Sequence, residues 1–294
     1  MSSPSHSKIL LIGDSLTQTS FEGWGAGLAH RYQRRADILN RGMSGYNTRW
    51  WLEYANQAGV WNESGEIKFA TIWFGANDAS LASENPHHHI PYVHPVVHVH
   101  FFCFCLISRF FLTVCLLSPL PPPFAKRLEE YQSNLKKIAT IFQESYPKAK
   151  LFFITPPPVH HEQRLAFQKQ RYGEKATGIL ERTLESAGKY ADACKVVAQQ
   201  LNIPCLDMYN LMKEDGDGNF GRFLWDGLHF SKEGHDFVLK MILNFITLEF
   251  PSLSVTPCPL TGQENNSGSI CPGIPNSGPY HDKIDSKGNW KDSF

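Results

Sequence analysis

The sequence has few of the features that mark secreted, membrane-bound or nucleic-acid-binding proteins. Its 294 residues include only seven Cys, an odd number without regular spacing, which argues against a disulfide scaffold and favours a reducing compartment. Lys and Arg together number 28, as do Asp and Glu, so no excess of positive charge is available for nucleic acid or an anionic membrane. Residues 1–8 are polar, and the apolar run at 9–12 is too short for a signal peptide. We therefore expect a cytoplasmic protein that acts on a small, weakly charged molecule and has no nucleic-acid partner.

Hydrophobic residues make up 42% of the chain, enough to fill the core of one large α/β domain. Short apolar segments that predict strands alternate with longer segments that predict helices. This alternation predicts a parallel sheet with helices on both faces. We expect strands at 8–13, 37–39, 69–74, 150–154 and 203–206, and helices at 24–34, 50–58, 128–146, 173–201 and, after the N-cap Ser231, up to 249.

Polar turns that contain glycine follow three of the predicted strands. Gly-Asp-Ser at 13–15 follows the first strand, the loop 40–48 follows the second, and Gly-Ala-Asn-Asp at 75–78 follows the third. Ligands of open parallel sheets bind at the carboxyl ends of the strands. We therefore expect the three turns to meet at one edge of the sheet and to form a site there.

Two segments do not fit the alternation of strands and helices. Residues 251–294 are rich in Pro, Gly, Ser and Asn and predict a disordered tail. Residues 92–127 begin with several His, continue with an apolar run and end near three prolines. The predicted organisation is one domain over 1–250, interrupted by an anomalous insert at 92–127.

Two functional interpretations of the insert are unfavourable. A membrane span is disfavoured because the apolar run 101–117 is barely long enough, contains Arg109 and would separate the two halves of one domain. A metal site is disfavoured because the six His between 87 and 100 lack the Cys and carboxylate partners of such a site. We expect neither a membrane span nor a bound metal.

We favour a third interpretation of the insert, a retained intron. Phe, Leu, Ser and Pro, whose codons can consist of pyrimidines alone, dominate residues 106–124. The codons of Ala125 and Lys126 can then contain the AG of a splice acceptor. Removal of 92–127 would join a short loop directly to the helix predicted from 128. This hypothesis requires an exon boundary near these codons.

Ser15, Asp226 and His229 have the chemistry needed for nucleophilic catalysis. A serine at a strand-to-helix turn exposes its hydroxyl, although serine is also a common turn and N-cap residue. The imidazole of His229 can accept the serine proton near pH 7, and the carboxylate of Asp226, three residues earlier, can orient the ring. A surface Asp and His ahead of a helix would give the same spacing, so this motif alone is a weak signal.

Two further residues can stabilise an oxyanion. Gly45, in the loop after the second strand, can offer an unobstructed backbone N–H. Asn77, in the turn after the third strand, can offer a side-chain amide. Taken singly, each has a plainer explanation as a loop glycine or a turn asparagine. Asp14 can brace the nucleophile turn or simply cap the following helix, and Tyr46, Asn47, Arg49 and Trp225 are candidates for the pocket wall.

Together these blocks resemble the SGNH hydrolases, the GDSL family of esterases and lipases. Four blocks match in order: Gly-Asp-Ser-Leu at 13–16, Gly45, Gly-Ala-Asn-Asp at 75–78 and Asp-Gly-Leu-His at 226–229. The resemblance is greatest to the isoamyl acetate-hydrolysing esterases of that family, at residues 23–25, 39–42, 44–49 and 226–229. The resemblance covers about 8–250, apart from the insert.

The resemblance implies a flavodoxin-like three-layer α/β/α fold with a central parallel sheet of about five strands. It also implies a Ser15, Asp226 and His229 triad, an oxyanion hole from Ser15, Gly45 and Asn77, and no cofactor or metal. The expected activity is hydrolysis of short-chain acyl esters similar to isoamyl acetate. Hydrolysis of another acyl group (a sugar O-acetyl ester, a thioester or a lysophospholipid) and an inactive splice product remain alternatives. The oligomeric state is left open.

Overall fold

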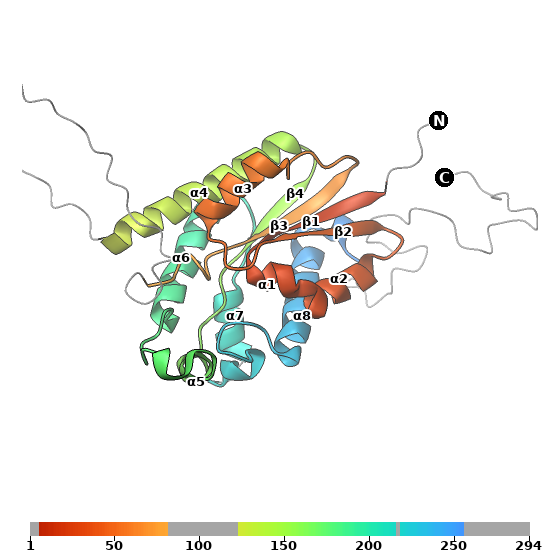
Figure 1. Ribbon diagram of the computed structural model, residues 1–294. Helices are drawn as coiled ribbons and strands as arrows, with labels where there is room; N and C mark the ends of the chain where they lie inside the picture. The colour runs from red at the N-terminus through yellow and green to blue at the C-terminus, as the bar shows by residue number, and fades with distance from the viewer. Residues whose placement is uncertain (1–5, 82–122, 216–217, 256–294) are drawn as a thin grey trace, which may run out of the picture.

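The computed structural model describes residues 6–81, 123–215 and 218–255 (Figure 1). A sheet of five parallel strands forms its centre, in the order β2-β1-β3-β4-β5. Because β2 lies on one side of β1 and β3 on the other, the strand order reverses at β1. The strands are β1 (Ser7–Gly13), β2 (Ala36–Gly42), β3 (Ile67–Trp73), β4 (Lys150–Ile154) and β5 (Cys205–Leu206).

Helices cover both faces of the sheet (Figure 1). Side chains of β1 alternate between two cores: Ile9 and Leu11 face one, whereas Leu10 and Ile12 face the other. The first core lies against α2 (Trp24–Tyr32), α7 (Met208–Asp215) and α8 (Lys232–Glu249). The second core lies against α3 (Thr48–Ala58), α4 (Pro123–Ser145) and α6 (Leu184–Leu201). The prediction of a three-layer α/β/α fold with a five-stranded parallel sheet is confirmed.

Shorter elements complete the described chain. The α-helices α1 and α5 and the 3₁₀ helices η1 and η2 lie between strands and long helices, η3 lies between α7 and α8, and η4 follows α8. Their bounds are α1 (Ser15–Gln18), α5 (His161–Tyr172), η1 (Thr19–Glu22), η2 (Gly173–Lys175), η3 (Phe220–Phe223) and η4 (Pro251–Leu253).

The helix predicted over 173–201 begins eleven residues later than expected. Gly173 and Gly178 have φ values of +56° and +73°, which interrupt helical geometry after α5. The hydroxyl of Thr183 then accepts a hydrogen bond from the Ser186 N–H at 3.0 Å and caps α6. The helices α5 and α7 were not predicted.

Two other predicted boundaries move by three residues or more, and the remaining ones by one or two residues. Strand β2 continues through residues 40–42, which were predicted as a loop, because Asn40 and Gly42 pair with Leu11 and Gly13 of β1. Helix α4 begins at Pro123, five residues before the predicted start at 128 and within the predicted insert. Arg127 of this helix donates a hydrogen bond to the Ser80 carbonyl at 3.1 Å. The rest of the insert, 92–122, lies outside the described residues.

The described chain continues past the predicted domain end at 250. Leu253 is buried in the first core, and its carbonyl accepts a hydrogen bond from the Tyr32 hydroxyl at 2.7 Å. Ser254 is also buried, and its hydroxyl lies 2.8 Å from the Thr247 hydroxyl of α8. Residues 256–294 of the predicted tail lie outside the described residues.

Candidate active site

The carboxyl edge of the sheet carries the five residues that the sequence singled out. Ser15 begins α1 directly after β1, Gly45 follows β2 and Asn77 follows β3, while His229 lies between η3 and α8. These four residues line one cavity of about 610 Å³. The fifth, Asp226, is buried beside His229. The strand order reverses at β1, so the cavity lies where ligands of such sheets bind.

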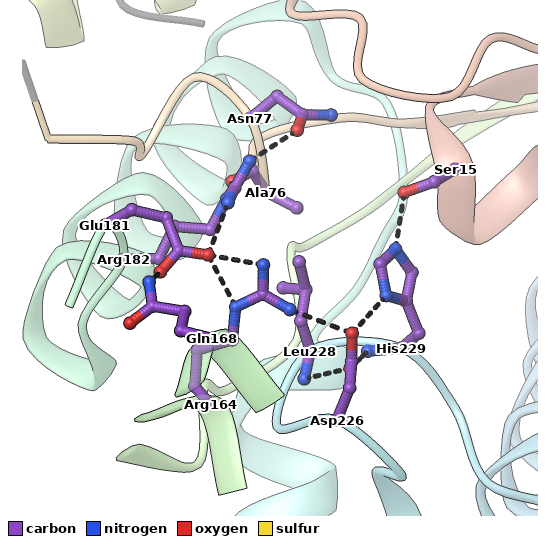
Figure 2. Close-up of polar contacts among 10 residues, drawn as sticks. All are labelled: Ser15, Ala76, Asn77, Arg164, Gln168, Glu181, Arg182, Asp226, Leu228 and His229. Carbon is purple, nitrogen blue, oxygen red and sulfur yellow. Dashed lines mark hydrogen bonds and ion pairs between the residues drawn. The ribbon is translucent and has the colours of Figure 1, made fainter. Parts of the chain in front are cut away.

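The turn that holds Ser15 is fixed by Asp14. Asp14 is the N-cap of α1, and its Oδ1 accepts a hydrogen bond from the Leu16 N–H at 3.0 Å. The Thr19 hydroxyl donates to the Ser15 carbonyl at 2.8 Å. Of the two roles expected for Asp14, the structure shows the cap. Ser15 is only 7% exposed, and its side chain faces His229 (Figure 2).

Ser15, His229 and Asp226 form a continuous chain of polar contacts (Figure 2). The Oγ of Ser15 lies 3.0 Å from Nε2 of His229, and Nδ1 of His229 lies 2.8 Å from Oδ2 of Asp226. An ionised carboxylate only accepts hydrogen bonds, so the neutral ring carries its proton on Nδ1. Nε2 is then free to accept the proton of the Ser15 hydroxyl.

Asp226 is held as a carboxylate by its neighbours. Its Oδ1 accepts hydrogen bonds from the backbone N–H groups of Leu228 at 2.9 Å and His229 at 2.7 Å. Its Oδ2 accepts a further bond from Nη1 of Arg164 at 2.8 Å. Burial alone would raise the pKa of Asp226, but the hydrogen bond and charge of His229, with Arg164, lower it to about 2. Asp226 therefore stays negative and can stabilise a protonated His229.

Gly227 allows the chain to turn between Asp226 and His229. Its φ is +83°, a conformation that residues with a Cβ rarely adopt. A Cβ at this position would lie 2.5 Å from the His160 carbonyl oxygen and 2.6 Å from the Arg164 nitrogen. The backbone N–H of His160 also donates to the Gly227 carbonyl at 2.9 Å. The turn is thus packed directly against the start of α5.

Asn77 and Gly45 place N–H groups at the cavity. The Oδ1 of Asn77 accepts a hydrogen bond from Nη2 of Arg182 at 2.8 Å, and its Nδ2 donates to the Tyr46 carbonyl at 2.9 Å. An amide NH₂ has two hydrogens, so one remains available toward the cavity. Gly45 has a φ of +80°, which glycine adopts without strain. Together with Ser15, these residues line the same cavity.

Asp14 is buried without a full set of partners. Its side chain is 0% exposed, and its Oδ2 has no hydrogen-bond partner among the described residues. Burial raises the pKa of Asp14 to about 7, against the hydrogen bond from Leu16. The nearby Asp78 raises this pKa further, and Arg182 lowers it. The folded protein therefore retains the Asp14 proton to a higher pH than the unfolded chain does.

This raised pKa predicts a pH-dependent gain in stability for Asp14→Asn. Wild-type stability should fall as pH rises from the unfolded pKa of Asp14 toward about 7, since the folded state binds more protons over that range. Asparagine has no proton to lose, and its Oδ1 keeps the cap. From about pH 5 to about pH 8, the variant should gain on the order of 2 kcal/mol relative to wild type. Urea unfolding at several pH values measures this difference; a difference that is independent of pH would contradict the assignment.

One wall of the cavity comes from α5, η2 and the segment before α6. The four residues proposed from sequence as pocket lining are not part of it. The side chain of Asn47 caps α3, and Tyr46 and Arg49 line separate surface depressions. Trp225 is 58% exposed, and its ring stacks near that of His229, with the centroids 6.3 Å apart.

Three charged residues of this wall were not predicted from the sequence. Arg164, Glu181 and Arg182 are all buried, and each lines the cavity. Arg164 contacts Asp226, Arg182 contacts Asn77, and Glu181 joins the two arginines, as Figure 2 shows. Their spacing gave no motif, because their pairing depends on how α5 packs against the segment before α6.

The described residues contain neither a metal-binding cluster nor a membrane-spanning helix. No group of three or more His, Cys, Asp and Glu side chains within 6–81, 123–215 and 218–255 is placed to hold a metal ion. Within the same ranges, no helix is both long enough and apolar enough to cross a membrane.

Most of the chain is similar in sequence to known proteins. The model of the GDSL-like lipase/acylhydrolase family matches residues 11–237. A GDSL esterase/lipase of Arabidopsis thaliana is 35% identical over 241 residues, which cover 80% of this chain and 83% of that protein. The isoamyl acetate-hydrolyzing esterase 1 homolog of Homo sapiens is 35% identical over 250 residues, or 84% of each chain.

Solved structures share the fold at lower sequence identity. The lipase/acylhydrolase from Enterococcus faecalis has a TM-score of 0.50 and 22% identity, covering 82% of this chain and 95% of that one. An acetylxylan esterase from Geobacillus stearothermophilus has a TM-score of 0.52 and 18% identity, covering 84% of this chain and 96% of that one. The family match over more than half of the chain and the relatives at 35% identity establish that the protein belongs to the GDSL-like lipase/acylhydrolase family and is a serine ester hydrolase.

Proposed function

We propose that the protein hydrolyses short-chain acyl esters similar to isoamyl acetate, with Ser15 as nucleophile, His229 as general base and Asp226 as the group that orients it. The observation that carries the proposal is the polar chain of 3.0 Å from Ser15 to His229 and 2.8 Å from His229 to Asp226. Relatives named for isoamyl acetate hydrolysis, at about one-third identity, support an acetate ester as substrate.

Acylation begins when the Ser15 Oγ attacks the ester carbonyl carbon and Nε2 of His229 takes the hydroxyl proton. Asp226, ionised because its pKa is about 2, stabilises the resulting imidazolium. The negative oxygen of the tetrahedral intermediate is bound by the N–H groups of Ser15 and Gly45 and by the Asn77 amide. His229 then protonates the leaving alcohol, which leaves an acyl group on Ser15.

Deacylation repeats the sequence with water. His229 takes a proton from the water as its oxygen attacks the acyl carbon, and the same three donors bind the second oxyanion. The proton returns to Ser15 as the acid leaves. Every proton transfer uses His229, so the proposed reaction requires no cofactor or metal.

A second candidate substrate is an acyl ester of a polar alcohol, such as an O-acetylated sugar. The cavity favours this class because its wall is largely polar. Gln168, Arg171, Lys175 and Thr177 line it, whereas Ile179 and Leu228 are its only aliphatic residues larger than alanine among those described. These polar groups suit a hydroxylated leaving group better than a branched alkyl chain.

A panel of esters tests both candidates with the purified chain. Isoamyl acetate, isoamyl butyrate, isoamyl octanoate and an O-acetylated monosaccharide are compared by kcat/KM for acid release. We expect acetates to be the best substrates and kcat/KM to fall with acyl length. Faster turnover of the sugar ester than of isoamyl acetate would select the second candidate. Failure to hydrolyse any of these esters, or a rise with acyl length, would contradict the proposed function.

A further inference from the structure

A buried chain of charges begins at the Asp226 carboxylate. Nη1 of Arg164 donates to Oδ2 of Asp226 at 2.8 Å, and Nε of Arg164 donates to Oε1 of Glu181 at 2.5 Å. Oδ2 of Asp226 is the oxygen that also contacts His229. Arg164 therefore holds the carboxylate in the orientation that directs Oδ2 at the imidazole.

The same glutamate joins a second arginine that reaches Asn77. Oε1 of Glu181 accepts a bond from Nη1 of Arg182 at 3.1 Å. Nη2 of Arg182 donates to Oδ1 of Asn77 at 2.8 Å, and its Nε donates to the Ala76 carbonyl at 2.7 Å. Figure 2 shows this path from Asp226 through Arg164, Glu181 and Arg182 to Asn77.

Arg182 and the Tyr46 carbonyl together fix the orientation of the Asn77 amide, one through its oxygen and the other through its nitrogen. The two ends of an amide are almost equal in shape, but a guanidinium contains only donors and can bind only the oxygen. Bound to Arg182, Asn77 directs Nδ2 to the opposite side, toward Ser15 (Figure 2). If the amide rotated by half a turn, its oxygen would face the developing oxyanion and repel it.

A gain in folding stability does not explain why these three charged side chains are buried. Arg164, Glu181 and Arg182 are 7%, 5% and 4% exposed. The desolvation of buried ion pairs offsets most of their attraction, and apolar replacements of similar volume are often no less stable. The three charged residues instead fix the orientation of two groups, the Asp226 carboxylate at one end and the Asn77 amide at the other.

We propose that Arg164, Glu181 and Arg182 form a positioning network that fixes the Asn77 amide and the Asp226 carboxylate relative to each other. The network thereby sets the position of the oxyanion donor Asn77 relative to that of the general base His229, which Asp226 orients. The three residues act through Asn77 and Asp226. The inference rests on the proposed function, because it assigns these residues a role in that reaction.

Arg182→Gln tests the network through its effect on Asn77. Asn77→Ala should lower kcat by about 10²–10³ with little change in KM, since it removes one oxyanion donor. Arg182→Gln should lower kcat by about 10-fold to 100-fold, also with little change in KM, because it removes the guanidinium that holds the Asn77 oxygen and leaves the Tyr46 carbonyl as the remaining contact that orients the amide. Once Asn77 is absent there is no amide to orient, so Arg182→Gln in the Asn77→Ala background should lower kcat by less than about 3-fold.

Two further variants keep the test decisive if Arg182→Gln folds poorly. Arg182→Lys retains one donor for Asn77 and should recover part of kcat. Glu181→Gln should lower kcat about 10-fold by weakening both arginine contacts. Its matched control is Glu63→Gln, because Glu63 also joins two cations, Lys8 and Arg41, outside the cavity. The control should keep kcat within about 2-fold of wild type. Circular dichroism and thermal unfolding confirm that each variant is folded.

The outcomes separate this inference from the proposed function. If folded Arg182→Gln and Glu181→Gln keep wild-type kcat, or if Arg182→Gln has its full effect in the Asn77→Ala background, the network does not position Asn77. In those cases turnover that still requires Ser15 leaves the proposed function intact. Wild-type turnover that does not require Ser15 would instead overturn the proposed function itself.

Discussion

Ser15→Ala is expected to lower kcat for acetate ester hydrolysis by about 10⁴–10⁶. The substitution removes the attacking oxygen, the Ser15 Oγ, which lies 3.0 Å from Nε2 of His229. The small residual rate would come from binding and from the oxyanion donors. Steady-state kinetics and circular dichroism of the two purified proteins measure the effect and the integrity of the fold.

The matched control for this variant is Ser133→Ala. Ser133 is exposed on α4 and does not line the cavity. Alanine is also well tolerated in helices, so turnover and stability should both stay near wild type. A folded Ser15→Ala protein that retained more than about one-tenth of wild-type kcat would show that Ser15 is not the nucleophile.

His229→Ala should be comparably severe, because Ser15 and His229 act as a unit. Without a base beside it, the Ser15 hydroxyl keeps its proton and is a poor nucleophile. The double variant Ser15→Ala/His229→Ala should be no less active than either single variant, since each removes the same step. Steady-state kinetics of the two single variants and the double variant measure this non-additivity.

His30→Ala is the control for this set, because His30 is exposed on α2 and does not line the cavity. It should keep wild-type turnover. Single losses that multiply in the double variant would mean that Ser15 and His229 contribute independently. That result would exclude proton transfer between them as the activating step.

The main features of the fold follow from local signals. Apolar segments such as 8–13 and 150–154 are strands, and the turns after β1, β2 and β3 meet at one edge, because parallel connections place the carboxyl ends of these strands together. The position of Ser15, Gly45 and Asn77 around one cavity was predictable for that reason. His229 joins them from a distant part of the sequence, and only the motif at 226–229 indicated it.

The helix α5 was missed because its buried face is polar. Arg164 and Gln168, one helical turn apart, are its buried residues, so the apolar periodicity that predicts a helix is absent. Their burial is possible because Glu181 accepts hydrogen bonds from both. A sequence cannot show that partner, since the pairing depends on the packing of two segments in the folded state.

The end of β2 was missed for a different reason. Asn40, Arg41 and Gly42 are polar or small, and the sequence therefore predicted a loop. Strand pairing uses backbone groups, and these residues continue the register with β1 as far as Gly13. The Asn40 amide also donates to the Thr17 carbonyl at 2.8 Å, which ties the end of β2 to the helix that begins at Ser15.

Covalent labelling of the active chain tests the central claim most directly. An organophosphonate esterase probe mimics the tetrahedral intermediate and reacts only with an activated serine, and peptide mapping by mass spectrometry then locates the adduct. We expect a single adduct on Ser15, formed in step with the loss of ester hydrolysis and absent from His229→Ala. An adduct on another serine, or full inactivation with Ser15 unmodified, would contradict the assignment of Ser15 as the nucleophile.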